Sequence, residues 1–290
     1  MPVDEQAQRL VDLPIIPNGW GWAATGVGPD FAVLLLAADT PFDARRAGRT
    51  TRYRLYRRTV GSFDVFEFQH EGAAYTHVQP IGDGNFLLVT PGIYEAMRDK
   101  RNGDVWSSEG RLIGKILLGD GINNVQTSVR SEVWVGYHDE GVYGAGEPGL
   151  ACFDAAGKRV LSFADSVADD DRVPVIDDCY ALNVAADDDV WVYYFKAFPL
   201  VRLVDKRLGA IWPDTPGVGA HAFAVGERTV LFAGDYGAPS SLTRYFPESG
   251  RSEMGHAIAD GHQLDFTRAI GRADRLYLVA NSAIWLVQAD

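Results

Sequence analysis

The fold is decided by the stretch Glu132-Val-Trp-Val-Gly-Tyr137, which returns almost unchanged as Asp189-Val-Trp-Val-Tyr-Tyr194. Both stretches are short apolar runs rich in Val and aromatic residues, which is typical of buried β-strands. A pattern that recurs along a chain indicates a repeat architecture. Weaker copies of this pattern occur at residues 31–36, 85–89, 229–233 and 275–279.

The six copies are spaced like the blades of a β-propeller. Val33 and Tyr277, taken as equivalent positions of the first and last copy, lie 244 residues apart over five steps, or about 49 residues per step. Four-stranded propeller blades repeat at roughly 40–50 residues. A short apolar strand precedes each of the clearer copies and a second hairpin follows, most clearly at 150–163. The sequence therefore predicts an all-β fold, a six-bladed β-propeller of four-stranded antiparallel blades.

The last repeat is one strand short. It ends with its third strand, Ala283–Gln288, whereas the segment Arg9–Ile16 precedes the first repeat and has no partner in it. We expect this segment to join the last blade as its outer strand, which leaves no missing edge. Pro14 suits an outer edge because proline has no N–H to donate. Residues 1–290 are thus predicted to form one propeller domain, with blades at 17–70, 71–119, 120–165, 176–214, 217–258 and 262–290 plus strand 9–16.

The third repeat resembles a known class of blade. The stretches Asn124-Val-Gln-Thr-Ser-Val129, Trp134-Val-Gly-Tyr137 and Gly149-Leu-Ala-Cys-Phe-Asp-Ala-Ala-Gly-Lys158 are similar to NHL-type and two-component-regulator-type propeller repeats. The likeness is partial in the fourth repeat and only a pattern elsewhere. It implies the fold and no particular chemistry, because these families share architecture rather than activity. Six-bladed propellers also include calcium-dependent lactonases of the gluconolactonase and paraoxonase type, but no full ligand set of theirs maps onto this sequence.

The charge of the chain limits its partners. With 39 acidic and 27 basic residues its net charge is −12, so phosphate backbones and anionic membranes repel it. We expect no nucleic-acid partner and no membrane partner. One local basic cluster is interpreted as a solvated strand face, with an anion site as the alternative. The cluster consists of Arg45, Arg46, Arg49, Arg52, Arg54, Arg57 and Arg58.

The cysteines and the first residues bear on the compartment. Cys152 and Cys179 are the only two cysteines and do not make a disulfide framework. The first ten residues, MPVDEQAQRL, lack the basic-then-apolar pattern of a secretory signal. We therefore expect a cytoplasmic protein.

In a propeller, the loops that enter the innermost strands and the loops that join the second strand to the third lie on one face. Polar and aromatic residues in these loops form the predicted working face, where we expect a small-molecule or protein ligand. The predicted ligand-binding residues are Trp22, Tyr94, Asn124, Asp139, Tyr143, Asp178, Lys196, Tyr236, His262 and Asp265. The candidate catalytic residues are His77, His138, Glu140 and His221.

The longest of these loops runs from Tyr137 to Gly149 and contains three successive polar groups. On extended backbone His138 and Glu140 would point to one side and Asp139 to the other. Such groups suit acid–base chemistry or a hard metal ion. The alternative is a solvated loop whose acids accept hydrogen bonds from turn amides.

The alignment of the innermost strands bears on whether the protein binds a metal. Counting back from the central strands places His77, Asn124 and His221 at one position of three innermost strands. Inward-pointing imidazoles could hold a divalent metal or a water network, or could pack within the blades. The acidic runs 169–171 and 177–178 are interpreted as a surface loop, with a calcium site as the alternative. No cofactor is otherwise evident, because phosphate-loop, nucleophile-elbow and zinc-helix motifs are absent from the sequence.

Two classes of function stay open. The first is a soluble propeller that binds a small molecule or a protein at its loop-rich face. The second is a propeller enzyme, a hydrolase, lactonase or isomerase, that uses the His and acid groups of the same face with or without a divalent ion. The loops do not repeat one aromatic residue in every blade, which argues against a multivalent lectin.

Overall fold

The computed structural model describes residues 4–97, 99–168 and 170–290. The chain divides into two compact units: the first unit is Pro14–Phe163, and the second unit combines Met1–Leu13 with Ala164–Asp290. Each unit holds three blades of four antiparallel strands, and the predicted six-bladed β-propeller is confirmed. That the whole chain forms one domain stays a prediction.

The first unit holds blades 1 to 3, whose strands pair in chain order. Blade 1 is β3 (Gly21–Val27), β4 (Val33–Ala38), β5 (Thr51–Arg58) and β6 (Phe63–His70). Blade 2 is β7 (His77–Ile81), β8 (Asn85–Val89), β9 (Gly103–Trp106) and β10 (Leu112–Ile116). Blade 3 is β11 (Ile122–Thr127), β12 (Val133–Tyr137), β13 (Leu150–Phe153) and β14 (Arg159–Ser162). The first strands of the blades are neighbours, since β7 contacts both β3 and β11.

The second unit holds blades 4 to 6. Blade 4 is β15 (Asp178–Ala186), β16 (Asp189–Phe195), β17 (Leu200–Val204) and β18 (Arg207–Trp212). Blade 5 is β19 (Ala222–Val225), β20 (Val230–Ala233), β21 (Ser241–Phe246) and β22 (Arg251–Ala259). Blade 6 is β24 (Arg268–Arg272), β25 (Arg275–Ala280), β26 (Ala283–Gln288) and β2 (Gln8–Asp12). The short helices are α1 (Phe42–Arg46), η1 (Glu140–Ala145) and α2 (Phe163–Val167), none of which is long and apolar enough to span a membrane.

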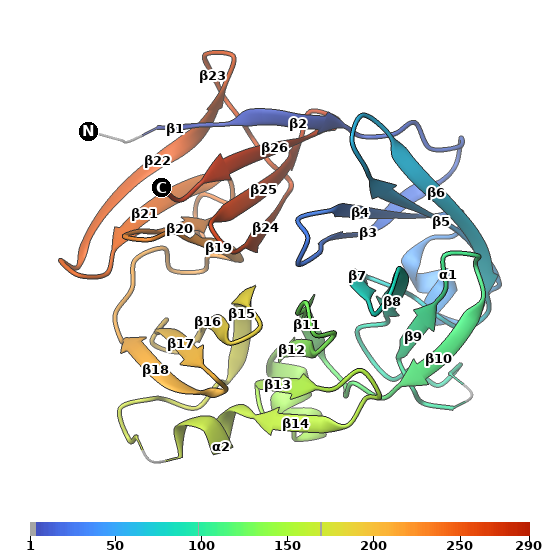
Figure 1. Cartoon of the computed structure of the whole chain (residues 1–290), viewed down its shortest axis with the longest axis horizontal. Coiled ribbons are helices and arrows are strands. Elements are labelled where there is room, and N and C mark those ends of the chain that lie inside the picture. Colours follow the sequence, from blue (N-terminus) through green and yellow to red (C-terminus); the bar gives the residue numbers. More distant parts are fainter. Residues whose placement is uncertain (1–3, 98, 169) are drawn as a thin grey trace. The chain divides into compact units, whose positions relative to one another are not determined.

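The N-terminal segment completes the last blade, as predicted from the strand count. Strand β2 runs antiparallel to β26, with Gln8 opposite Leu286 and Asp12 opposite Ala283 (Figure 1). It ends before Pro14, so the strand is shorter than the predicted segment. Strand β1 (Glu5–Gln6) pairs in parallel with β22 of blade 5, and β23 (His262–Gln263) also pairs with β22. The N-terminal segment therefore bonds to two neighbouring blades.

Burial explains why the second strand of each blade dominates the sequence pattern. Strand β12 is buried at all five positions, and its Trp134 is 1% exposed. A strand covered on both faces has no reason to alternate polar with apolar residues. The outer strand β6 alternates between half-buried and exposed residues over most of its length. Continuous apolar runs therefore mark the central strands, and outer strands give a weaker signal.

Neighbouring first strands approach most closely at glycines. A Cβ atom added to Gly26 of β3 would lie 1.9 Å from the carbonyl oxygen of Val78 on β7. One added to Gly271 of β24 would lie 1.7 Å from the carbonyl oxygen of Phe223 on β19. These separations are far below van der Waals contact, so only glycine fits at either position.

Arg244 of β21 ties the N-terminal segment to blade 5. Its Nε and Nη2 donate to the two carboxylate oxygens of Glu5 at 2.7 and 2.8 Å. Its Nη1 donates to the Thr229 hydroxyl at 2.8 Å and to the carbonyl of Ala289. The Arg244 and Glu5 side chains are only 15% and 12% exposed, so this is a largely buried, bidentate ion pair.

Candidate functional site

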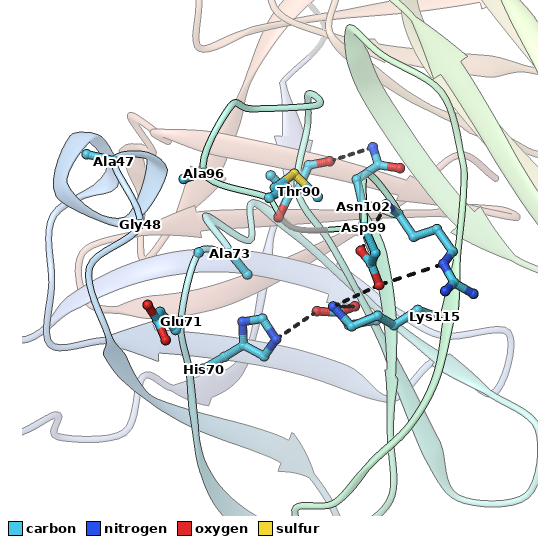
Figure 2. Close-up of a pocket in the computed structure, with 14 residues that line it drawn as sticks. Ala47, Gly48, His70, Glu71, Ala73, Thr90, Ala96, Asp99, Asn102 and Lys115 are labelled. Carbon is cyan, nitrogen blue, oxygen red and sulfur yellow. Dashed lines mark hydrogen bonds and ion pairs between the residues drawn. The ribbon is translucent and has the colours of Figure 1, made fainter.

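The first unit contains a cavity of about 530 Å³ whose walls come from blades 1 and 2. One wall is formed by His70 at the end of β6 and by the segment that follows it. The other is formed by the loop 90–102 between β8 and β9, by Asp104 of β9 and by Lys115 of β10. Figure 2 shows these groups converging from their separate elements.

Asp104 reaches the cavity from a core position. In β9 it lies directly opposite Lys115 of β10 and Leu88 of β8. Residues two apart in a strand share a face, and the next such residue, Trp106, packs against Phe68 at a ring-centroid distance of 4.3 Å. The Asp104 carboxylate therefore stands at the edge of the apolar core between blades 1 and 2, where it is 3% exposed.

One oxygen of Asp104 is held by the protein. The Tyr75 hydroxyl donates to Oδ2 at 2.5 Å, and the Trp106 indole N–H donates to the Tyr75 oxygen at 3.4 Å. His70 Nε2 lies 3.6 Å from the same carboxylate oxygen. Burial raises the pKa of Tyr75 well above its usual value. The phenol therefore stays protonated and donates a hydrogen bond to the carboxylate.

Ion pairs continue from Asp104 along the wall. Lys115 Nζ lies 3.4 Å from Asp104 Oδ1 and 3.7 Å from Asp99 Oδ2. Arg101 Nε lies 3.7 Å from the same Asp99 oxygen. Charge-assisted hydrogen bonds are about 2.7–2.9 Å long. These groups are therefore close enough to attract one another, and each retains hydrogen-bonding capacity (Figure 2).

Three residues of the cavity carry buried polar atoms that lack a hydrogen-bond partner within the described part of the chain. The atoms are Asp104 Oδ1, Thr90 Oγ1 and His70 Nδ1. Each such group costs roughly 1–3 kcal/mol relative to a satisfied one, and folded proteins contain few of them. Their concentration around one cavity makes it the candidate site.

The imidazole of His70 is affected by burial. Loss of hydration lowers its pKa from the ordinary value of 6.5, and the negative charges of Asp104, Asp99 and Glu71 offset part of this, whereas Lys115 adds to it. The folded chain therefore holds His70 neutral at pH 7. The proton of neutral imidazole is favoured on Nε2, which faces the Asp104 carboxylate.

This shift predicts a pH dependence of stability. Because the folded pKa lies below the unfolded value, the unfolded chain binds more protons near pH 6, so the contribution of His70 is present above about pH 6.5 and is lost below it. When the pH falls from 7.5 to 5.5, the free energy of unfolding should decrease less in His70→Asn than in the unchanged protein. Denaturant unfolding at both pH values measures this. His262→Asn, which removes an exposed imidazole, is the control. Equal losses in the protein and in His70→Asn would contradict the assignment.

The structure places eight of the residues singled out from the sequence in the first unit. Trp22 lies on β3, His77 begins β7, Asn124 lies on β11, and Tyr94 lies in the β8–β9 loop. His138, Asp139, Glu140 and Tyr143 lie together at and within η1. That they bind a ligand or act in catalysis stays a prediction.

The loop after Tyr137 is helical where the sequence suggested extended backbone. Asp139 has helical dihedral angles and caps η1 by accepting a hydrogen bond from the amide of Glu140 at 2.8 Å. The same amide lies 3.2 Å from Nδ1 of His138. The alternation argument for His138 and Glu140 was therefore wrong, because it requires a strand-like backbone. Tyr143 is 70% exposed.

The other six residues lie in the second unit. Asp178 begins β15, Lys196 follows β16 with Nζ 3.8 Å from Asp177 Oδ2, and the hydroxyl of Tyr236 lies 2.5 Å from that of Tyr180. His221 precedes β19. His262 lies on β23, and Asp265 accepts a hydrogen bond from Gln263.

The register that grouped three innermost residues was wrong by one position for His221. His77 pairs with Val89 and Asn124 pairs with Gly136, and these partners lie two residues after Leu87 and Trp134, the aligned residues of their second strands. The equivalent residue in blade 5 is Ala222, which pairs with Ala233. The surrounding protein lowers the pKa of His221 by desolvation, although the residue as a whole is exposed.

Metal ligands do not gather in the structure. Across 4–97, 99–168 and 170–290, no three or more His, Cys, Asp or Glu side chains are placed to hold one ion. The calcium alternative for the acidic run 169–171 includes Asp169, which lies outside the described residues.

Three arginines of the basic cluster have acidic partners. Arg52, Arg54 and Arg57 pair with Asp39, Glu67 and Asp30 respectively. Arg52 and Arg54 also lie over the ring of Trp20, at 5.7 and 5.4 Å from its centroid. These pairs agree with a solvated strand face for the part of the cluster that lies on β5.

Comparison with known proteins yields one partial family match and several structures of the same fold. The profile of the YxzG family matches residues 150–287, just under half of the chain. No curated protein matches the sequence.

Solved structures of low sequence identity share the fold. Hsv2 of Kluyveromyces lactis is 8% identical, with a TM-score of 0.53 over 90% of this chain and 70% of that one. YCF48 bound to the D1 peptide is 8% identical, with a TM-score of 0.53 over 96% and 81%. The nidogen/laminin complex gives 10% identity and a TM-score of 0.52 over 87% and 91%. At these identities the likeness supports the propeller fold and assigns no activity.

Proposed function

We propose that the chain is a ligand-binding propeller and that its site is the polar cavity between blades 1 and 2. The observation that carries this proposal is the set of three buried polar atoms without a hydrogen bond, on Asp104, Thr90 and His70, around one hollow of about 530 Å³. Cavities of roughly 300–1,000 Å³ with a few placed polar groups are typical of small-molecule sites.

The energetics favour a bound molecule over a purely structural role. A fold that only needed to fill this space would use apolar side chains, as the adjoining core of Phe68 and Trp106 does. A ligand whose polar groups complete the hydrogen bonding of Thr90 and Asp104 gains the free energy of those hydrogen bonds on binding.

The position of the cavity also agrees with the expected working face. Loop 90–102, which supplies Thr90, Asp99 and Asn102, joins the second strand of blade 2 to the third, and it contains Tyr94. Propellers of the same fold bind protein ligands, since YCF48 is described with the D1 peptide and nidogen with laminin. The polar hollow of this chain, with a volume of about 530 Å³, suits a small molecule better than a peptide.

Thr90→Val tests the site. The substitution keeps the side-chain volume and removes the hydroxyl, so we expect the affinity for a bound ligand to fall about fivefold or more, the equivalent of one hydrogen bond. The measurement is a thermal-shift screen of sugars, polyols, amino acids, organic acids and amines, followed by calorimetry of the hits on both proteins.

Thr243→Val is the matched control. Thr243 of β21 is also buried with an unpartnered hydroxyl, and it lies in the second unit. Both substitutions relieve an unsatisfied group, so both should leave the unfolding free energy unchanged or raised by about 1 kcal/mol. A screen without any hit, or hits that both variants bind equally, would refute the proposal.

Acid–base catalysis is a second candidate for the same cavity. The observation in its favour is that one carboxylate, Asp104, faces both the imidazole of His70 and the phenol of Tyr75. A histidine oriented by a carboxylate is a common general base. Nuclear magnetic resonance of a bound ligand would show conversion to product, and conversion that is lost in His70→Asn would favour an enzyme.

A further inference from the structure

The charges on the cavity wall cancel. Arg101, Asp99, Lys115 and Asp104 follow one another with alternating sign, separated by 3.7, 3.7 and 3.4 Å. Glu71 also lines the cavity, but its carboxylate lies on the far side of His70 from this row (Figure 2). A charged ligand would have to displace one member of the row and leave its partner uncompensated in a partly buried place, which is costly.

The spacing of the charged groups in the row fits a ligand group that both donates and accepts hydrogen bonds. Lys115 Nζ has ion pairs but no hydrogen bond to any described residue, and Asp104 Oδ1 has no hydrogen-bond partner there either. A hydroxyl can accept from the ammonium and donate to the carboxylate at once. An ammonium can only donate and a carboxylate can only accept, so neither serves both neighbours. Two adjacent hydroxyls would use Lys115, Asp104 and Asp99 together.

Small apolar side chains also line the cavity. Ala47, Ala73 and Ala96 are among the lining residues, and Figure 2 shows the three alanines on the side away from Asp99 and Lys115. Small side chains of this kind accept a flat C–H face. A polyhydroxylated ring or chain has such a face and an edge of hydroxyl groups.

Resting on the proposed function, we infer that the ligand is a small, neutral, polyhydroxylated molecule of monosaccharide or hexitol size. Its hydroxyls occupy the row from Asp104 to Arg101, and its C–H face lies against the alanines. Lys115 and Asp104 then determine the charge class that the cavity accepts.

Two sets of probes separate charge from shape. Sorbitol, gluconate and glucamine share one six-carbon chain and are neutral, anionic and cationic; glucose, glucuronate and glucosamine form the cyclic set. Calorimetry on the full chain should give the neutral member of at least one set an affinity about tenfold or more above its charged relatives. Asp104→Asn removes a negative charge and should shift preference toward the anion, whereas Lys115→Met should shift it toward the cation.

Control measurements separate an effect on folding from an effect on ligand binding. Lys115 is 26% exposed, so its replacement should fold, and circular dichroism checks Asp104→Asn. Lys206→Met removes a lysine from the turn between β17 and β18 in the second unit and should leave the preference unchanged. A charged probe that binds best, or no shift in either cavity variant, would overturn the inference. If a charged ligand from the wider screen still loses affinity in Thr90→Val, the inference fails while the proposed function stands.

Discussion

Replacing Gly26 by alanine is expected to lower the free energy of unfolding by about 3 kcal/mol or more. The added Cβ would lie 1.9 Å from the carbonyl oxygen and 3.0 Å from the carbonyl carbon of Val78. Both atoms belong to the backbone of β7, which is paired with β8, so no side-chain rotation can relieve the overlap. Overpacking of this kind usually costs 1–3 kcal/mol, and more where the neighbour is rigid. Denaturant unfolding of the purified variant measures the effect.

Gly21→Ala is the matched control in the same strand. A Cβ on Gly21 meets no atom within 4 Å, and alanine restricts the unfolded chain, which stabilises a protein by about 0.4–1 kcal/mol where the backbone permits it. We therefore expect Gly21→Ala to be neutral or slightly stabilising. Similar losses in the two variants would mean that the close approach of β3 and β7 is not what requires glycine.

Arg244→Met is expected to cost about 3 kcal/mol. Methionine preserves most of the side-chain length, but the Glu5 carboxylate, 12% exposed, loses both of its arginine donors. Removing one partner of a buried pair typically costs 3–5 kcal/mol, because the remaining charge is left uncompensated. The measurement is the urea midpoint of unfolding together with its slope.

Arg111→Met provides the comparison for Arg244. Its pair with Glu109 has both side chains more than 60% exposed, and exposed pairs contribute about 0–1 kcal/mol. A double-mutant cycle of Arg244→Met with Glu5→Gln isolates the pair itself. A coupling energy near zero would show that Arg244 acts through Thr229 and the Ala289 carbonyl instead.

The sequence was most informative where burial alone decides the residue. Trp134 and Trp191 lie in strands that are buried on both faces over most of their length, so their apolar runs could be counted into six blades. The same count left one strand missing from the last blade, and the pairing of Gln8 with Leu286 confirmed where it comes from. Register was less secure, since a one-residue offset moves a side chain to the opposite face, as happened with His221.

The cavity could not be found in the same way. His70, Thr90, Asp104 and Lys115 come from four separate segments, and packing of blade 1 on blade 2 brings them together. Each is ordinary in its own stretch of sequence. The one available signal was Asp104, an acid two residues before the core residue Trp106 and therefore in core register. The helical turn at η1 was also missed, because local backbone angles there override the polar pattern.

The N-terminal segment has a consequence for the order in which the chain acquires its structure during synthesis. Glu5 and Arg244 are 239 residues apart in sequence, and β2 has to wait for β26 to leave the ribosome. At roughly 5–20 residues per second, those first strands stay without partners for about ten seconds to a minute. The first unit is continuous in sequence, so the part of the chain that carries the candidate site is free to fold long before the second unit is complete.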